Sequence, residues 1–113
     1  MTEARLFALQ RLSAMVLAPL VLVHVVVIIY ATRSGLSADA LLERTTSSFL
    51  WPLFYGLFVV VAAIHAPIGL RNVLREWTPL PRRGVDGAVA VFALVLLALG
   101  LRAVWAVTGG GVP

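Results

Sequence analysis

Three long apolar segments, separated by polar connections, dominate the pattern of the chain. They run from about residue 6 to 30, from about 49 to 74 and from about 87 to 107. Each is long enough to cross a bilayer as a helix, which takes roughly 20 residues. None shows the polar–apolar alternation of a strand, and a helix satisfies all its backbone hydrogen bonds within the segment. The pattern predicts an all-α integral membrane protein with three transmembrane helices.

The remaining local signals lie in the connections and at two prolines. Ser37 is a favourable N-cap for a short helix at about 38–44, which would lie at the membrane interface. Pro19 and Pro67 lie inside the first and second apolar segments. Each removes a backbone hydrogen bond, so a kink is expected at each.

The composition agrees with a membrane protein and limits its chemistry. Of the 113 residues, 61% are hydrophobic and 12% are charged, which is too apolar for a soluble domain of this size. There is no cysteine, so this chain carries no disulfide, thiolate metal site or iron–sulfur cluster. The net charge of +4 indicates topology and lipid contact rather than nucleic-acid binding. We expect one membrane-anchor domain, residues 1–113.

The arginines are distributed unevenly between the two ends of the predicted helices. The first connection holds Arg33 and Arg44, offset by Asp39 and Glu43. The opposite end holds six arginines: Arg5, Arg11, Arg71, Arg75, Arg82 and Arg83. By the positive-inside rule, the N-terminus is expected in the cytoplasm and the C-terminus outside.

Both histidines of the chain lie inside apolar segments, where an ionisable residue is a functional-site hypothesis by default. His65, Gly69, Asn72 and Glu76 follow at helical spacing and share one face. Gly69 leaves room beside the imidazole for something flat and bulky, which suggests haem ligation. His24 is flanked by valines, and such low-dielectric surroundings suit a neutral imidazole at a metal.

The two histidines are expected at different depths in the membrane. Counted at about 1.5 Å per residue, His24 lies roughly 20 Å from Arg11 and His65 roughly 9 Å from Arg71. One upright haem is therefore not expected to join both. Each histidine needs a second ligand from a two-fold copy of the chain or from a different partner subunit. The alternative for either is a hydrogen bond to a neighbouring helix without any cofactor.

A second polar group is expected near the cytoplasmic interface. Its members are Gln10, Arg11, Leu12, Ser13, Glu76 and Trp77. A cation, a hydroxyl, a carboxylate and an indole at this depth could bind a quinone headgroup, whose carbonyls need donors and whose reduction needs a proton route. A snorkelling arginine beside an aromatic belt explains the same residues, and on spacing alone it is the stronger interpretation. Arg71 or Arg11 could also pair with haem propionates.

At these residues the chain resembles a membrane-anchor cytochrome b subunit of the succinate dehydrogenase/fumarate reductase family. The family motif His-Arg-x-Ser-Gly, which opens the first helix, reads Gln10-Arg11-Leu12-Ser13-Ala14 here. The haem-ligating histidine followed by x-x-x-Gly-x-Arg is matched by His65, Gly69 and Arg71. The resemblance covers about residues 9–77.

The end of the second segment matches less closely. The Asp-Tyr pair that a sister anchor chain carries at the quinone site reads Glu76-Trp77 here, and Trp77 lacks the phenolic hydroxyl. The fusion type of the family, one chain of five helices with two haems, has a histidine deep in its first helix, as His24 is here. The resemblance therefore supports the haem contacts more strongly than the quinone contacts.

The resemblance implies a division of labour in a complex of the bacterial inner membrane. A flavoprotein subunit oxidises succinate or reduces fumarate, and an iron–sulfur subunit passes the electrons on. The anchor docks both on the cytoplasmic face and houses haem b and a quinone site, for ubiquinone or menaquinone. A second anchor chain, an identical copy or a paralogue, completes the helical bundle. This chain is then an electron-transfer subunit that is not catalytic alone.

The resemblance also implies roles for single residues. His65 and His24 would be the axial ligands of haem iron, with Gly69 and Arg71 in the haem neighbourhood. The implied quinone-binding residues are Arg11, Ser13, Glu76 and Trp77.

Three other functions stay open on the residues alone. The chain could be a haem-free anchor of such a complex, a small transporter or channel protomer, or a purely structural membrane adaptor. The apolar segments contain no acidic residue of the sort that proton-coupled transporters use, which argues against the second of these.

Overall fold

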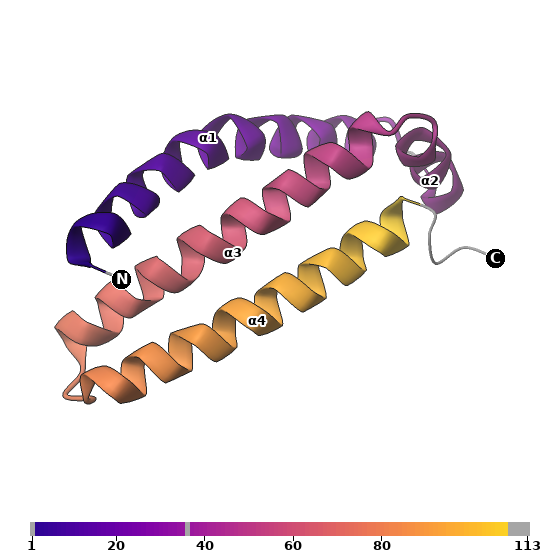
Figure 1. Cartoon of the computed structure of the whole chain (residues 1–113). Coiled ribbons are helices and arrows are strands. Elements are labelled where there is room, and N and C mark those ends of the chain that lie inside the picture. Colours follow the sequence, from indigo (N-terminus) through magenta and orange to yellow (C-terminus); the bar gives the residue numbers. More distant parts are fainter. Residues whose placement is uncertain (1, 36, 109–113) are drawn as a thin grey trace.

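The structure, a computed structural model, describes residues 2–35 and 37–108. These residues form four helices and no strand: α1 (Glu3–Arg33), α2 (Ala38–Thr46), α3 (Leu50–Trp77) and α4 (Arg82–Val107) (Figure 1). The helices α1, α3 and α4 are long and apolar enough to cross a membrane. The prediction of an all-α protein with three membrane helices is therefore confirmed. Each long helix extends past its apolar segment by at least one polar residue.

Local sequence explains where the first two helices begin and end. Thr2 caps α1, because its side chain accepts a hydrogen bond from the backbone N–H of Arg5 at 3.2 Å. After α1, Gly35 has a φ of 62°, a conformation that glycine adopts without strain. The hydroxyl of Ser37 then accepts a hydrogen bond from the N–H of Ala40 at 3.2 Å, as expected for the N-cap of α2.

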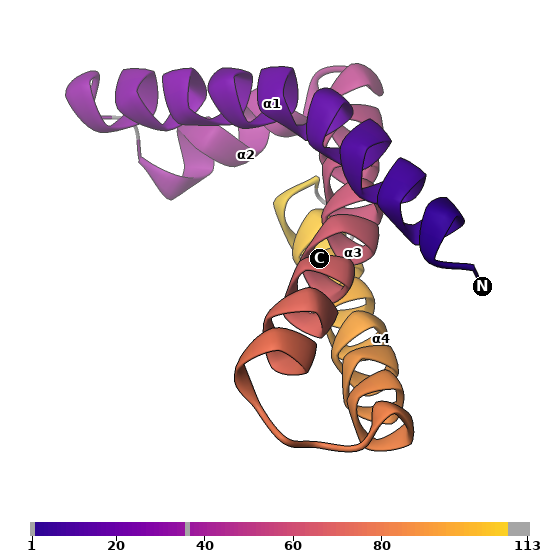
Figure 2. The same cartoon turned by 90° about the vertical axis from the view of Figure 1, so that its left-hand side faces the viewer.

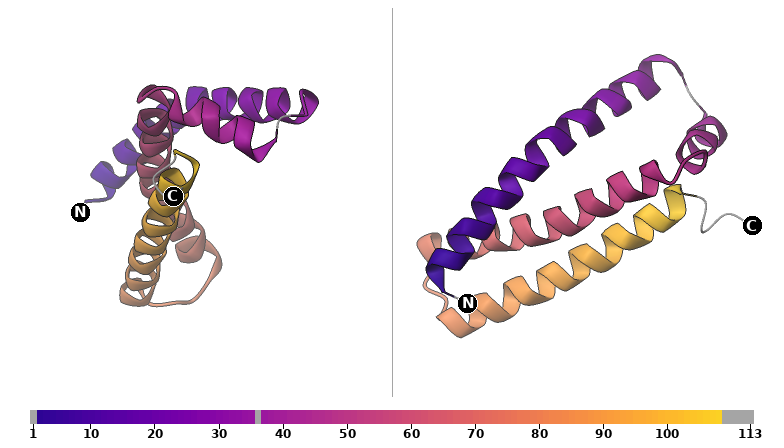
Figure 3. Two further views of the ribbon diagram at one scale, coloured as in Figure 1. Left: turned by 90° about the vertical axis from the view of Figure 1, so that its right-hand side faces the viewer. Right: turned by 45° about the horizontal axis from the view of Figure 1, so that its top comes forward.

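The helix α3 lies between α1 and α4 and packs on both (Figure 1). The N-terminus of α1 and the α3–α4 connection lie at one end of the molecule, and α2 lies at the other. Figure 2 shows that α1 crosses α3 at a steep angle, and Figure 3 (right) shows the two diverging towards the end that carries α2. The arginine-rich segments therefore share one end of the bundle, as the predicted topology requires. The orientation in the membrane stays a prediction.

The first helix curves along its length (Figure 1). Pro19 lies inside α1 and cannot donate to the carbonyl of Met15, one turn earlier. Pro67 lies inside α3 in the same way and is buried. Towards its C-terminal end, α1 diverges from α3 (Figure 3, right).

The chain buries little of its apolar surface against itself. Among the described residues, the buried hydrophobic side chains are Ile68, Val85 and Val89, while many large apolar side chains on all three long helices are exposed. An apolar surface of this extent marks contact with lipid or with other helices. The fold therefore presents most of its hydrophobic surface to a membrane or a partner.

One close contact holds α3 against α4. A Cβ atom at Gly100 would lie 2.5 Å from Cγ1 of Val59, far inside normal contact distance. Small residues of this kind let membrane helices approach closely. Gly100 therefore determines how near the two helices lie.

Candidate functional site

His65 lies in the second half of α3 and faces α1. Its Nδ1 atom is 3.1 Å from the Oγ atom of Ser13. Ser13 is buried, with 6% of its surface exposed, and its hydroxyl also donates to the backbone carbonyl of Gln10 at 3.0 Å. Within the part of the chain that the structure describes, Nδ1 is the ring nitrogen of His65 that has a hydrogen-bond partner. We call this pair the Ser13–His65 contact.

Gly69 lies one turn after His65 and also faces α1. A Cβ atom at Gly69 would lie 3.3 Å from Nε2 of Gln10, so a larger residue here would press on that amide. The Oε1 atom of Gln10 is buried and has no hydrogen-bond partner among the described residues. The two helices thus meet through a small polar patch with an unused acceptor beside His65.

His24 lies further along α1, at the level of Tyr55 and Phe58 in α3. Its ring centroid is 6.0 Å from that of Tyr55 and 5.3 Å from that of Phe58, both in edge-on geometry. Tyr55 and Phe58 precede His65 by ten and seven positions, which corresponds to roughly 10–15 Å along a helix. The two histidines therefore lie at different levels of the bundle, as counting along the sequence predicts.

A cavity of about 750 Å³ lies beside His24 and is lined by residues of all four helices. Its lining is almost entirely apolar, and its size is typical of small-molecule and cofactor sites, which span roughly 300–1,000 Å³. The Nδ1 atom of His24 is buried and lacks a hydrogen-bond partner among the described residues. Leaving such an atom unpaired costs about 1–3 kcal/mol. The cavity therefore has an imidazole in its wall, and the unpaired Nδ1 of that imidazole is turned into the protein.

The residues around both histidines fit a haem. A porphyrin brings four ligands of its own, so the protein need supply only axial ones. No cluster of three or more His, Cys, Asp or Glu occurs among the described residues, so a metal held by side chains alone has no site there. His65, beside Ser13, and His24, at the wall of its cavity, each offer one imidazole at a separate level. The Gln10 amide of the same chain lies next to Gly69, so the space that the sequence predicts beside this glycine is already in use. One chain supplies one ligand per level, and a bis-histidine site needs a second chain.

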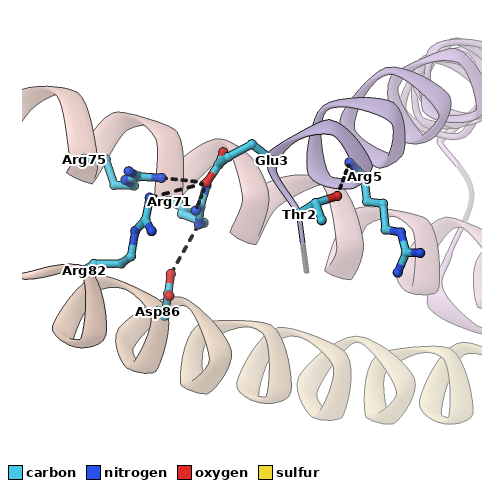
Figure 4. Close-up of polar contacts among 7 residues, drawn as sticks. All are labelled: Thr2, Glu3, Arg5, Arg71, Arg75, Arg82 and Asp86. Atoms are coloured by element: carbon cyan, nitrogen blue, oxygen red, sulfur yellow. Dashed lines mark hydrogen bonds and ion pairs between the residues drawn. The ribbon is translucent and has the colours of Figure 1, made fainter.

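Arg71 belongs to a group of charged side chains that joins α1, α3 and α4 at one end (Figure 4). Arg71 is buried, with 7% exposed; its Nη2 lies 2.6 Å from Oε1 of Glu3 and its Nε lies 3.2 Å from Oδ1 of Asp86. Arg75 donates to the same Glu3 oxygen at 2.8 Å, and Arg82 lies 3.9 Å from it. We call these five residues the ionic cluster.

The charge state of the ionic cluster follows from its hydrogen bonds. Glu3 lies ahead of the apolar segment of α1, and the hydrogen bonds from Arg71 and then Arg75 hold the pKa of its carboxyl well below the usual range. Glu3 is therefore ionised at any physiological pH. The guanidinium of Arg71 is already paired with two carboxylates, and its predicted role beside a haem stays a prediction.

The four residues predicted to bind quinone do not gather into one pocket in this chain. Arg11 is exposed, and its guanidinium lies 5.6 Å from the ring centroid of Phe7. Glu76 and Trp77 are exposed at the end of α3, Trp77 by 81%. Ser13 contacts His65 instead. A quinone site built from them would need surfaces from a partner.

The comparison with known families decides what kind of protein carries these features. The model of the succinate dehydrogenase/fumarate reductase transmembrane subunit family matches residues 2–105. The chain belongs to this family. No curated protein and no solved structure gives a match. Membership confirms the family resemblance, and the chain is a multi-pass transmembrane subunit of a succinate dehydrogenase or fumarate reductase complex.

Two residues of this transmembrane subunit escaped the sequence reasoning. Glu3 and Asp86 are the acidic members of the ionic cluster, yet each stands alone among apolar or basic neighbours in the sequence. An acid in the first turn of one helix and an acid near the start of another were the available signals. Their common partner, Arg71, is 68 positions from Glu3, so spacing could not connect them.

Proposed function

We propose that this transmembrane subunit binds haem b through His65 and passes electrons between the iron–sulfur subunit and quinone. The observation that carries the proposal is the Ser13–His65 contact: an imidazole inside a membrane helix, held through one ring nitrogen by a buried hydroxyl. A ligating histidine typically has its other ring nitrogen hydrogen-bonded in this way. Family membership supports the same role.

His24 is proposed as the ligand of a second haem, at the level of its cavity. The support is an imidazole in the wall of an apolar space of cofactor size. Because the two histidines lie at different levels, the second ligand of each iron comes from another chain. A two-fold copy of this subunit would place His65 opposite His65 and His24 opposite His24. A paralogous anchor chain would fill the same positions.

Each of the residues around His65 would then have a separate role. The haem supplies a one-electron carrier when bound. His65 would hold the iron and Ser13 would orient the ring, while Gly69 would let the Gln10 side chain of α1 lie close to α3. Arg71 ties the ends of three helices together and so fixes the depth of α3.

The surface around the N-terminus would contact the quinone and the two soluble subunits. Arg11, Glu76 and Trp77 are exposed and would contact a quinone, ubiquinone or menaquinone, where a partner subunit closes the site. The exposed Arg5 and Arg83 lie at the proposed cytoplasmic end, where the iron–sulfur and flavoprotein subunits would dock. In a bacterium, this subunit would span the cytoplasmic membrane, and the two soluble subunits would lie on its cytoplasmic side.

The test is the haem absorbance of the purified complex with His65→Ala in this chain. We expect the band of the haem at this level to disappear while the chain stays inserted and assembled. His24→Ala is the companion variant: it should remove the band of the second haem and keep the band of the haem at His65, because the Ser13–His65 contact stays intact. Spectra that are unchanged by His65→Ala would contradict the assignment.

The haem content per chain then decides between the forms of the proposal. About one haem per chain in a symmetric pair means that both histidines ligate. Half that amount means that His65 ligates alone and His24 packs. A complex without haem leaves this subunit as a haem-free anchor.

A further inference from the structure

We infer that Ser13 positions His65: its hydroxyl holds the imidazole in the tautomer with the proton on Nδ1, which leaves the lone pair on Nε2. In the family motif that this chain matches, Ser13 was predicted to bind quinone, whereas the geometry gives it a different partner. The inference rests on the proposed haem role of His65 for its functional meaning. The tautomer itself can be measured without haem.

The direction of the hydrogen bond follows from counting protons. A serine hydroxyl has one proton and two acceptor lone pairs. The hydroxyl of Ser13 donates its proton to the carbonyl of Gln10 at 3.0 Å. At 3.1 Å from the same oxygen, Nδ1 of His65 must then be the donor. A neutral imidazole carries one N–H, so the proton on Nδ1 leaves Nε2 unprotonated.

This tautomer is the one that a ligand histidine requires. Iron binding needs a lone pair on the ligating nitrogen, and a hydrogen bond from the other nitrogen fixes the tautomer and the orientation of the ring. In the opposite tautomer the proton is on Nε2, and the lone pair of Nδ1 faces the hydroxyl of Ser13. That hydroxyl already donates its proton to the carbonyl of Gln10, so it has none for Nδ1. The contact therefore selects the state of His65 that can bind.

Burial strengthens this selection. Only 6% of the Ser13 surface is exposed, so water does not compete for the contact, and the low dielectric between the helices strengthens a hydrogen bond. The same proton count bears on the predicted quinone role. With its proton on the Gln10 carbonyl, Ser13 has none to donate to a quinone carbonyl.

The first experiment measures the tautomer by ¹⁵N NMR of the haem-free full chain, labelled at histidine, in nanodiscs. The chain has two histidines, and His24→Phe assigns the remaining signal to His65. We expect the wild type to be protonated on Nδ1, Ser13→Ala to lose this preference, and Ser13→Thr to restore it. A wild-type His65 protonated on Nε2 would overturn the inference.

The second experiment measures haem b binding to the assembled complex of the same variants. Removing the hydrogen-bond partner of a metal ligand typically weakens affinity about 10- to 100-fold, so we expect this loss in Ser13→Ala and its recovery in Ser13→Thr. The midpoint potential should shift in Ser13→Ala as well. Thr46→Ala is the control, because the hydroxyl of Thr46 donates within its own helix, α2, to the carbonyl of Leu42 at 2.8 Å.

The two experiments separate the two ideas. A wild-type complex that binds no haem would refute the haem role of His65, while the NMR result still decides the tautomer. A second outcome is that haem binds through His65 while Ser13→Ala changes neither the haem affinity nor the tautomer of His65. That result would refute the positioning role of Ser13 and leave the haem role of His65 standing. If Ser13→Ala does not fold, Ser13→Thr and Ser13→Cys carry the comparison, since threonine keeps the acceptor oxygen and cysteine replaces it with a weak sulfur acceptor.

Discussion

The contact between Gly100 and Val59 makes a quantitative prediction about how α3 and α4 pack. In Gly100→Ala, the new methyl group would start 2.5 Å from Cγ1 and 3.1 Å from Cγ2 of Val59, whereas carbon atoms prefer about 3.5–4.0 Å. Valine in a helix has one strongly preferred rotamer, so Val59 cannot turn aside and the helices must separate. Overpacking of this kind costs about 1–3 kcal/mol.

The helix α4 offers a matched control for this substitution. A Cβ atom at Gly87 would meet nothing within 4 Å, so Gly87→Ala carries only the gain in helix propensity, up to about 1 kcal/mol. We therefore expect Gly100→Ala to be less stable than Gly87→Ala by about 1–3 kcal/mol. The measurement is reversible unfolding of the full chain in mixed micelles by titration with a denaturing detergent.

A second substitution tests the cause. Val59→Ala removes both methyl groups that the new Cβ would meet, so Val59→Ala with Gly100→Ala should recover most of the loss. Equal stability of Gly100→Ala and Gly87→Ala would refute the reasoning, because the helices would then not be in contact at Gly100. A loss that Val59→Ala does not relieve would place the clash elsewhere.

Three further predictions follow from the charged and polar residues. Arg71→Gln should lower the free energy of unfolding by about 1–3 kcal/mol, since it removes the hydrogen bonds of a buried guanidinium and takes this partner from Asp86, while Glu3 keeps Arg75. Arg82→Gln, at an exposed 3.9 Å contact, should cost less than about 1 kcal/mol in the same titration. His24→Phe removes a buried unpaired nitrogen, so the haem-free chain should be at least as stable as the wild type. The same substitution should halve the haem content of the complex. Full haem content would make His24 a packing residue. Arg11→Ala should slow quinone reduction and spare succinate oxidation by an artificial acceptor; equal loss in both assays would contradict a quinone role.

The long helices could be predicted because hydrophobic length alone decides them. An uninterrupted apolar segment of about 20 residues has one stable backbone in lipid. The pairing of the helices could not be predicted in the same way. Apolar residues surround α1 on all sides, so the sequence does not mark which of its faces meets α3. That Ser13 turns towards His65, while Arg11 turns away, depends on this rotation.

The His24 cavity shows a second limit of the sequence. The valines around His24 predict an apolar environment, and the structure has one. The size of the cavity depends on how far α1 diverges from α3 beyond Pro19, and on α2 lying across the end. A proline predicts that a helix bends but does not give the direction or the extent of the bend. The apolar environment of His24 could be predicted from the sequence, whereas the size of the cavity beside it could not.

The ionic cluster has a consequence for the order in which the subunit assembles during its synthesis. Glu3 is made 68 positions before Arg71, and Arg71 is made 15 positions before Asp86. The first helix is therefore synthesised before its charged partner, and Glu3 gains that partner only when the second long helix is in place. Asp86 then arrives with the third. Because one buried arginine receives a carboxylate from each side, the third long helix completes the attachment of the first.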